Sequence, residues 1–248
     1  MFFLIYLHPL FKNFIKMKKV LFFVLTVFLF TSCSNKEDEN TMYVKGTIQG
    51  LKKGTLYLQK QMDTLIVSVD SVFVDGTDTF LLKDIITSPE MYYLTLGDTN
   101  KKISFFGEKD TITIHSKLNN FAVKSKIAGS ENQDLLEKYY DIKSKFSNQN
   151  LDLIKAEFDA KKSGNNDSIV LIQRQLKSLT KRQYLFSVNY AINNADYEVA
   201  PYIALTELNN VVLNLLDTIN NALTPEVKQS KYGVKLDAFV LKIRENEK

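Results

Sequence analysis

The side chains best suited to chemistry are few in this sequence of 248 residues. Cys33 is the only cysteine, which excludes an intramolecular disulfide, a Cys-x-x-Cys redox pair and a multi-cysteine zinc site. The two histidines are His8, in an apolar N-terminal region, and His115. A metal ligand or general base needs partner groups, and no cysteine or second histidine lies near His115. We therefore interpret His115 as a polar residue at the end of a strand.

Aspartates are the remaining candidates for catalysis, because hydrolases use pairs of carboxyl groups. Candidates for such a pair are Asp75, Asp78, Asp84 and Asp98. Most of them stand beside Gly or Thr, where Asp favours turns. The sequence has no Gly-rich phosphate loop, no Gly-x-Ser-x-Gly and no His-Glu-x-x-His. We expect neither enzyme activity nor a cofactor or metal, and a hydrolase is the weakest alternative.

The N-terminal region has the pattern of a signal peptide. Met17-Lys18-Lys19 is positively charged, Val20 to Phe30 is uninterrupted apolar sequence, and small residues precede Cys33. The apolar run is too short for a permanent membrane span, which takes ~20 residues as a helix. We predict a signal peptide at residues 1–32, with translation starting at Met17.

Leu29 to Cys33 resembles the lipobox of bacterial lipoproteins, in which lipid is attached to the cysteine and the chain is cut before it. That resemblance implies lipidation of Cys33 and a charged tether at residues 33–41. Lys36, Glu37, Asp38 and Glu39 resemble the surface-export signal of Bacteroidota lipoproteins. A solvated linker is the alternative interpretation. We expect anchoring in the cell envelope, with the outer membrane as the favoured location, on its periplasmic face or at the cell surface.

The net charge gives no indication of a nucleic-acid partner. The formal charge is +4, from 32 basic and 28 acidic residues. Four lysines and no acid precede Cys33, so the chain after the leader is neutral, with 28 basic against 28 acidic residues. A nucleic-acid-binding surface needs a basic excess, and we therefore expect no such partner.

Two kinds of hydrophobic pattern divide the mature chain. Between residues 42 and 128, short aromatic and β-branched runs alternate with turn residues and predict a β-sandwich-like antiparallel domain. The expected strands are 43–48, 55–58, 65–69, 91–96, 103–106 and 111–114. From residue 129 to 248 a helical period follows. The fold class is therefore α+β, with a β domain followed by a helical domain.

The helical part begins with Ser130 and Gln133, which resemble a capping box. Leu135, Tyr139, Ile142 and Phe146 define one apolar face, which Leu151, Ile154 and Phe158 continue. Ser163 to Asn166 interrupts this helix, and a longer helix is expected to reach Asn193. A further helix starts near Pro201, and Thr224-Pro225 opens the last helical segment.

A family resemblance rests on short motifs. They are Asp70-Ser71-Val72, Asp75-Gly76, Phe80, Pro89 and Gly129-Ser130-Glu131-Asn132. Together with the lipobox they resemble the domain of unknown function 4369 of Bacteroidota lipoproteins, which precedes a thioredoxin-like domain. In such proteins a stretch like Tyr232 to Leu236 leads into that domain, whereas this sequence ends at Lys248. The resemblance therefore implies no thiol chemistry here, and it leaves open a docking role in thiol-disulfide or peroxide chemistry or a truncated relic.

A recurring Asp-Ser/Thr-aliphatic triplet resembles the O-glycosylation acceptor of exported Bacteroidota proteins. The acceptor residues would be Thr64, Ser71, Thr111, Ser168 and Thr218. The alternative is that Asp-Ser and Asp-Thr simply form turns and caps.

Aromatic residues could line a ligand groove or pack in the core. The candidates are Met91-Tyr92-Tyr93, Phe105-Phe106 and Tyr139-Tyr140. The function we expect is that of a lipid-anchored, non-catalytic binding or assembly module. Its partner would be the membrane and another envelope protein, and its ligand is not indicated by the sequence.

Overall fold

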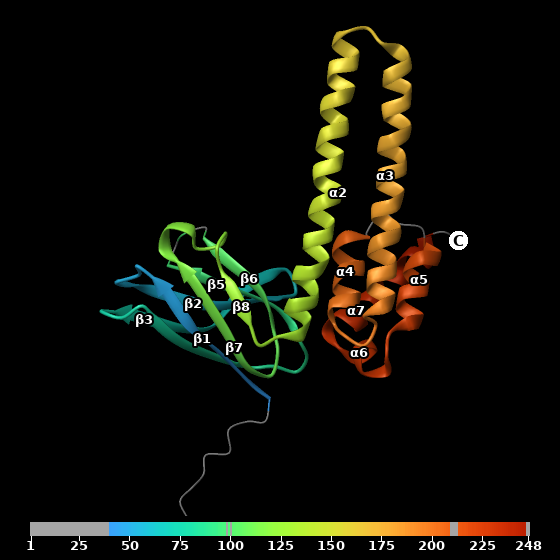
Figure 1. The fold of residues 1–248 in the computed structure, drawn as a ribbon. Helices are drawn as coiled ribbons and strands as arrows, with labels where there is room; N and C mark the ends of the chain where they lie inside the picture. The colour runs from blue at the N-terminus through green and yellow to red at the C-terminus, as the bar shows by residue number, and fades with distance from the viewer. Residues whose placement is uncertain (1–39, 98, 100, 209–212, 247–248) are drawn as a thin grey trace, which may run out of the picture. The chain divides into compact units, whose positions relative to one another are not determined.

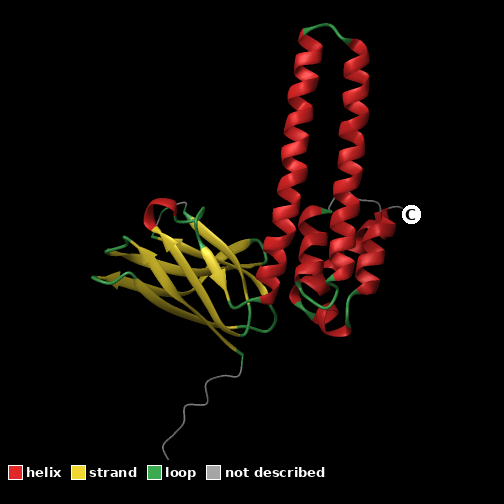
Figure 2. Ribbon diagram, viewed as in Figure 1, coloured by secondary structure: helices red, strands yellow, loops and turns green. Residues whose placement is uncertain are grey.

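The fold is described by a computed structural model that covers residues 40–97, 99, 101–208 and 213–246. Eight strands come first and six α-helices follow, which confirms the expected α+β class. Residues 40–248 form one compact unit. Figures 1 and 2 show the strands gathered in one layered region and the helices in another.

The strands form two four-stranded sheets. Their bounds are β1 Thr41–Gln49, β2 Lys53–Met62, β3 Leu65–Asp75, β4 Thr79–Ile85, β5 Glu90–Leu96, β6 Lys102–Gly107, β7 Asp110–Lys117 and β8 Lys126–Ala128. One sheet has the order β4-β1-β7-β8 and the other β3-β2-β5-β6. Neighbouring strands are antiparallel except β1 and β7, which are parallel, with Val44 opposite Ile112.

Alternation along the strands builds the core between the sheets, because successive side chains in a strand point to opposite faces. In β5, Tyr92 and Leu94 face this core and are fully buried. Met91 lies on the other face of β5 and belongs to a different apolar cluster. The same strand therefore serves two cores.

Six α-helices complete the described part of the chain. They are α2 Glu131–Lys162, α3 Asn166–Asn193, α4 Val199–Glu207, α5 Leu213–Ala222, α6 Pro225–Gln229 and α7 Lys231–Asn246. Side-chain caps start three of them: the side chains of Ser130, Asn165 and Thr224 accept hydrogen bonds from backbone N–H groups in the first turn. Within the described ranges, no helix is both long and apolar enough to cross a membrane.

The change from strands to helices occurs at Gly129 and Ser130, as predicted. Gly129 has a φ of +98°, and a Cβ there would lie 2.2 Å from the carbonyl oxygen of Thr111. Only glycine suits such a position. The Ser130 hydroxyl then accepts a hydrogen bond from the Gln133 N–H at 2.9 Å and starts α2.

The structure corrects some of the predicted elements. Strands β4 and β8 were missed, and the strand expected at 65–69 continues to Asp75. The first helix does not bury the whole predicted apolar face. Three of its residues on α2 are exposed: Leu151, Ile154 and Phe158. In this C-terminal half of α2, α3 is the one described element that packs against the helix.

Candidate functional site

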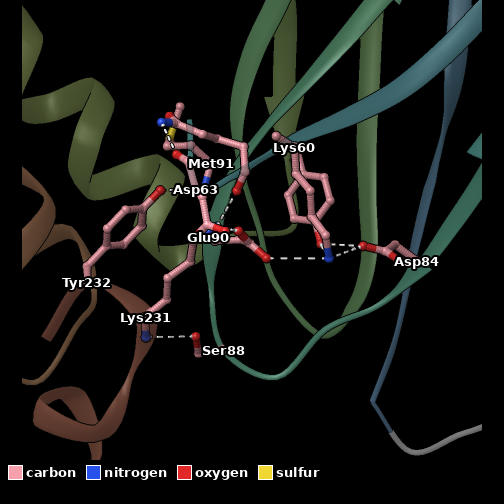
Figure 3. A network of polar contacts seen from close by, with 10 residues as sticks. Lys60, Asp63, Asp84, Ser88, Glu90, Met91, Lys231 and Tyr232 are labelled. Carbon is pink, nitrogen blue, oxygen red and sulfur yellow. Dashed lines mark hydrogen bonds and ion pairs between the residues drawn. The ribbon is translucent and has the colours of Figure 1, made fainter. Parts of the chain in front are cut away.

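Four charged side chains with little exposure to solvent lie close together where β2, β4 and β5 approach α7. Lys60 comes from β2, Asp84 from β4, Glu90 from the start of β5, and Lys231 from the start of α7. The exposed fractions of the Lys60, Asp84 and Glu90 side chains are 16%, 16% and 8%. We call these four residues the charge network, and Figure 3 shows Lys60 between Glu90 and Asp84.

Opposite charges alternate through the charge network. The Lys60 amino group lies 2.6 Å from an Asp84 oxygen and 3.5 Å from a Glu90 oxygen. Glu90 also accepts a hydrogen bond from the Lys231 amino group. Two cations therefore face two anions, which is the arrangement that charges at low exposure require.

A tyrosine hydroxyl completes the site on the sandwich side. Tyr92 donates a hydrogen bond to Asp84 at 2.7 Å. Burial, followed by this hydrogen bond to Asp84, raises the pKa of Tyr92 far above its ordinary value. The phenol therefore stays protonated near neutral pH and acts as a donor, not as a base.

The charge network and the contacts around it also fasten the start of α7 to the start of β5 and the end of β2. The Lys231 N–H donates to the Ser88 hydroxyl at 3.2 Å, and its amino group donates to the Gln61 carbonyl at 2.7 Å. The Met91 N–H donates to the Tyr232 hydroxyl at 3.0 Å (Figure 3). These contacts join segments more than a hundred residues apart, so we interpret the network as a structural latch.

A pocket of about 410 Å³ lies on the face of β5 and β6 that turns away from the sandwich core. Strands β5 and β6, α2 and α4 all contribute to it. Its lining residues are Met91, Tyr93, Lys102, Ser104, Gln133, Leu136, Tyr140 and Tyr202. We call it the tyrosine pocket.

The walls of the tyrosine pocket combine rings with one cation. The amino group of Lys102 lies 4.9 Å from the centre of the Tyr93 ring. Tyr202 packs edge-on against Phe106 and Tyr232, with ring centroids 5.3 and 5.2 Å away, so this wall is held in place from behind. Gln133 is already engaged, accepting from the Phe106 N–H at 2.9 Å.

Two of the pocket tyrosines, Tyr140 and Tyr202, are poor bases at neutral pH. Burial, with a smaller effect of Glu207, raises the pKa of Tyr140. Burial also raises the pKa of Tyr202, and the neighbouring Tyr140 adds to this effect. Neutral phenols offer hydrogen bonds and flat apolar surfaces. Tyr140 and Tyr202 therefore present neutral hydroxyl groups and supply no phenolate.

Several sequence-predicted residues lie outside the described residues. They are Cys33, Lys36, Glu37, Asp38, Glu39 and Asp98. Lipidation and surface export therefore stay predictions.

The five candidate glycosylation residues occupy different settings. Thr64 is exposed in the β2–β3 turn, Ser71 is exposed in β3, and Thr218 is exposed in α5. Thr111 and Ser168 are half-buried. Asp70, which precedes Ser71, accepts from the N–H groups of Ser71 and Lys83, each at 2.8 Å. That triplet thus has a structural role, while glycosylation stays a prediction.

Of the candidate aspartates, Asp78 lines a surface pocket together with His115. His115 is exposed within β7, which continues past it to Lys117, and its Nδ1 lies 2.8 Å from the Thr47 hydroxyl oxygen. Asp84, offered as one member of a carboxylate pair, lies in β4 and belongs to the charge network. Among the described residues, no group of three or more His, Cys, Asp or Glu could hold a metal ion.

The predicted aromatic candidates divide between core and pocket. Tyr92 and Phe105 lie in the sandwich core, whereas Met91, Tyr93 and Tyr140 line the tyrosine pocket. Period-two alternation in β5 could have signalled this split. Five residues of the charge network and the tyrosine pocket were not predicted: Lys60, Glu90, Lys102, Tyr202 and Lys231. Nothing in the sequence around them indicates contacts between segments that lie far apart along the chain.

Comparison with known proteins agrees with this picture for part of the chain. The two sheets followed by helices define an α+β protein. Residues 42–136 are a DUF4369 domain, matching the family model described as "Domain of unknown function (DUF4369)". The match includes β1 to β8 and the first residues of α2, so both sheets lie within it.

Two further comparisons add little. No curated protein matches the chain. A solved structure titled "pT26-6p" is 11% identical, covering 79% of this chain and 42% of its own, with a TM-score of 0.22. A likeness this weak carries no argument about fold or function.

Proposed function

We propose that this protein is a lipid-anchored envelope protein whose folded part is a non-catalytic module that binds a small ligand in the tyrosine pocket. The signal-peptide pattern and Cys33 support the anchor. The neutral charge balance after the leader gives no support to a nucleic-acid partner.

The tyrosine pocket is the observation that carries the binding role. Its volume of about 410 Å³ falls within the usual range for small-ligand sites. Its lining is more polar than apolar, because Met91 and Leu136 are almost buried and add little surface. Such a lining suits a ligand that carries a polar or charged group. The phenols of Tyr140 and Tyr202 remain protonated, which favours binding over acid–base chemistry.

The lining also indicates the class of ligand. Tyr93, Tyr140 and Tyr202 offer ring faces to a flat ring. Lys102 forms no ion pair with any described residue, so its amino group is available for an anionic substituent. A small aromatic carboxylate satisfies both requirements.

Calorimetric titration of residues 40–248 with phenylacetate tests this proposal. Lys102→Met should weaken binding about tenfold to a hundredfold, since a hydrogen bond to a charged group contributes about 1.5–3 kcal/mol. Lys101→Met is the matched control, because Lys101 is an exposed neighbour that does not line the pocket. Equal affinities for the two variants would contradict the assigned site.

The anchor needs a separate measurement, intact mass spectrometry of the protein purified from its own membranes. The proposal predicts a chain that starts at Cys33 and carries the added mass of acyl groups. A chain that retains residues 20–30 and carries no lipid would contradict it.

A further inference from the structure

Helices α2 and α3 form a long antiparallel hairpin whose outer half has two very different faces. At ~1.5 Å per residue, α2 is about 48 Å long. Figures 1 and 2 show the two helices side by side over this length. The residues that face the partner helix recur at spacings of three and four, which is the pattern of a coiled coil. In the outer half they are Asn150, Leu153, Glu157 and Ala160 on α2 and Ile169, Ile172 and Leu176 on α3.

Large apolar side chains lie on one face of the hairpin, beside the seam, which is the line of residues where α2 and α3 contact each other. Leu151, Ile154 and Phe158 follow seam positions of α2 by one residue and are 70%, 50% and 66% exposed. Val170 holds the equivalent position on α3 and is 49% exposed. Glu157 joins the two helices on this same face, since it accepts hydrogen bonds from Lys161 and from Gln173 of α3. We call Leu151, Ile154, Phe158 and Val170 the apolar row.

Cations flank the apolar row. Residues three or four positions apart are neighbours on a helix surface. On α2, Lys155 lies four positions after Leu151. Lys161 and Lys162 lie three and four positions after Phe158. On α3, Arg174 lies four positions after Val170. All four cations are exposed. Two acids lie beside them: Glu157, which pairs with Lys161, and Asp167, three positions before Val170. Four cations against two acids leave the surface around the row with a net positive charge.

The opposite face of the hairpin is more polar and balanced in charge. Asp152 and Arg182 line a shallow pocket there with Gln149 and Gln175. Asp159 lies two turns beyond Asp152 on the same side of α2. The row of exposed apolar residues and the excess of cations therefore coincide on the first face.

We propose that the face bearing the apolar row binds an anionic lipid surface. Large apolar side chains bordered by Lys and Arg are the composition of helices that lie in a membrane interface. Anionic lipids attract each nearby cation with about 1 kcal/mol. A second copy docked on the same face would instead bring the two sets of cations together, which opposes self-association. The proposal does not depend on the lipid anchor or on the tyrosine pocket.

Vesicle co-sedimentation of residues 40–248 tests this contact, since that unit is compact by itself and lacks the apolar leader. The probes are vesicles of pure phosphatidylcholine and vesicles of equal parts phosphatidylcholine and phosphatidylglycerol. Binding to the anionic vesicles should be at least about tenfold tighter, and about 0.5 M NaCl should weaken it strongly.

Two double variants and two matched controls locate the contact. Leu151→Ser with Phe158→Ser, and Lys155→Glu with Lys162→Glu, should each reduce binding to anionic vesicles about tenfold or more. Leu171→Ser and Lys145→Glu change exposed residues outside this face and should leave binding within about twofold. Circular dichroism of each variant checks that the helices remain.

Three results would overturn the proposal. The first is a lack of preference for anionic vesicles. The second is an equal loss of binding in the control variants. The third is a dimer in light scattering that Phe158→Ser abolishes, which would assign the face to a second copy of the chain.

Discussion

At the scale of single residues, Glu90 determines whether the charge network is balanced. Its carboxylate lies between the amino groups of Lys60 and Lys231 and is 8% exposed. Glu90→Ala would leave two lysines of low exposure facing each other with Asp84 as the one remaining anion of the network. We expect a loss of about 2–4 kcal/mol in the free energy of unfolding, measured by urea denaturation, because removing one partner leaves charge uncompensated.

An exposed ion pair provides the comparison for Glu90. Arg244 and Asp217 are 48% and 27% exposed and lie 2.7 Å apart. Asp217→Asn should change the free energy of unfolding by less than about 1 kcal/mol, because exposed pairs contribute little. Similar losses for Glu90→Ala and Asp217→Asn would contradict the latch interpretation.

Tyr139 makes stability depend on pH in the alkaline range. Burial raises the pKa of Tyr139 from 10.0 to about 12, although its hydrogen bond to Ser187 acts in the opposite direction. Between pH 10 and 12 the unfolded chain loses this proton and the folded chain keeps it. The stabilisation is therefore complete below pH 10 and is lost as pH rises toward 12, by roughly 2–3 kcal/mol.

Urea denaturation at pH 9, 10 and 11 measures this dependence for the native chain and for Tyr139→Phe. The variant keeps the ring and removes the proton, so its stability should fall less steeply, by about 1.4 kcal/mol per pH unit. Identical slopes would show that Tyr139 ionises equally in the folded and unfolded states.

Sequence reasoning at the residue scale succeeded where the interaction was local. The cap of Ser130 on Gln133 was predicted and is present. The reciprocal half of a capping box is absent, because the Gln133 side chain accepts from Phe106 and donates to Glu137. A tertiary contact thus replaced the local one, and the spacing of the two residues could not reveal it.

At the scale of elements, Gly233 sets how closely α6 and α7 approach. A Cβ at Gly233 would lie 2.0 Å from the Val227 carbonyl oxygen and 2.7 Å from the Lys228 Cα. Gly233→Ala must therefore push the two helices apart. We expect a loss of about 1–3 kcal/mol in the free energy of unfolding, and Val234→Ala, at an exposed neighbour, should cost under about 0.5 kcal/mol.

Helix positions were easier to predict than the side chains each helix buries. The breaks near Gly129 and Ser163 carry local signals and occur where expected. The predicted apolar stripe of α2 shows the limit. Tyr139 is fully buried, but Phe158 is 66% exposed, because burial depends on which helices pack nearby. Strand β4 was missed for a related reason, since exposed Leu81 and Ile85 obscure its alternation.

At the scale of the whole molecule, both candidate sites are assembled from distant segments. The charge network joins β2, β4 and β5 to α7, and the tyrosine pocket joins β5 and β6 to α2 and α4. No local pattern encodes pairings such as Glu90 with Lys231, 141 positions apart. The sequence therefore predicted the fold class and the change from strands to helices, but not every element and not the sites that their packing creates.

Methionine NMR tests the proposed binding role most directly. Residues 40–248 contain three methionines: Met91 lines the tyrosine pocket, Met42 is buried in the sandwich core, and Met62 is exposed at the end of β2. With ¹³C-methyl methionine, phenylacetate should shift the Met91 signal saturably and leave those of Met42 and Met62 unchanged. An unchanged Met91 signal, or equal shifts of all three, would contradict a ligand site in the tyrosine pocket.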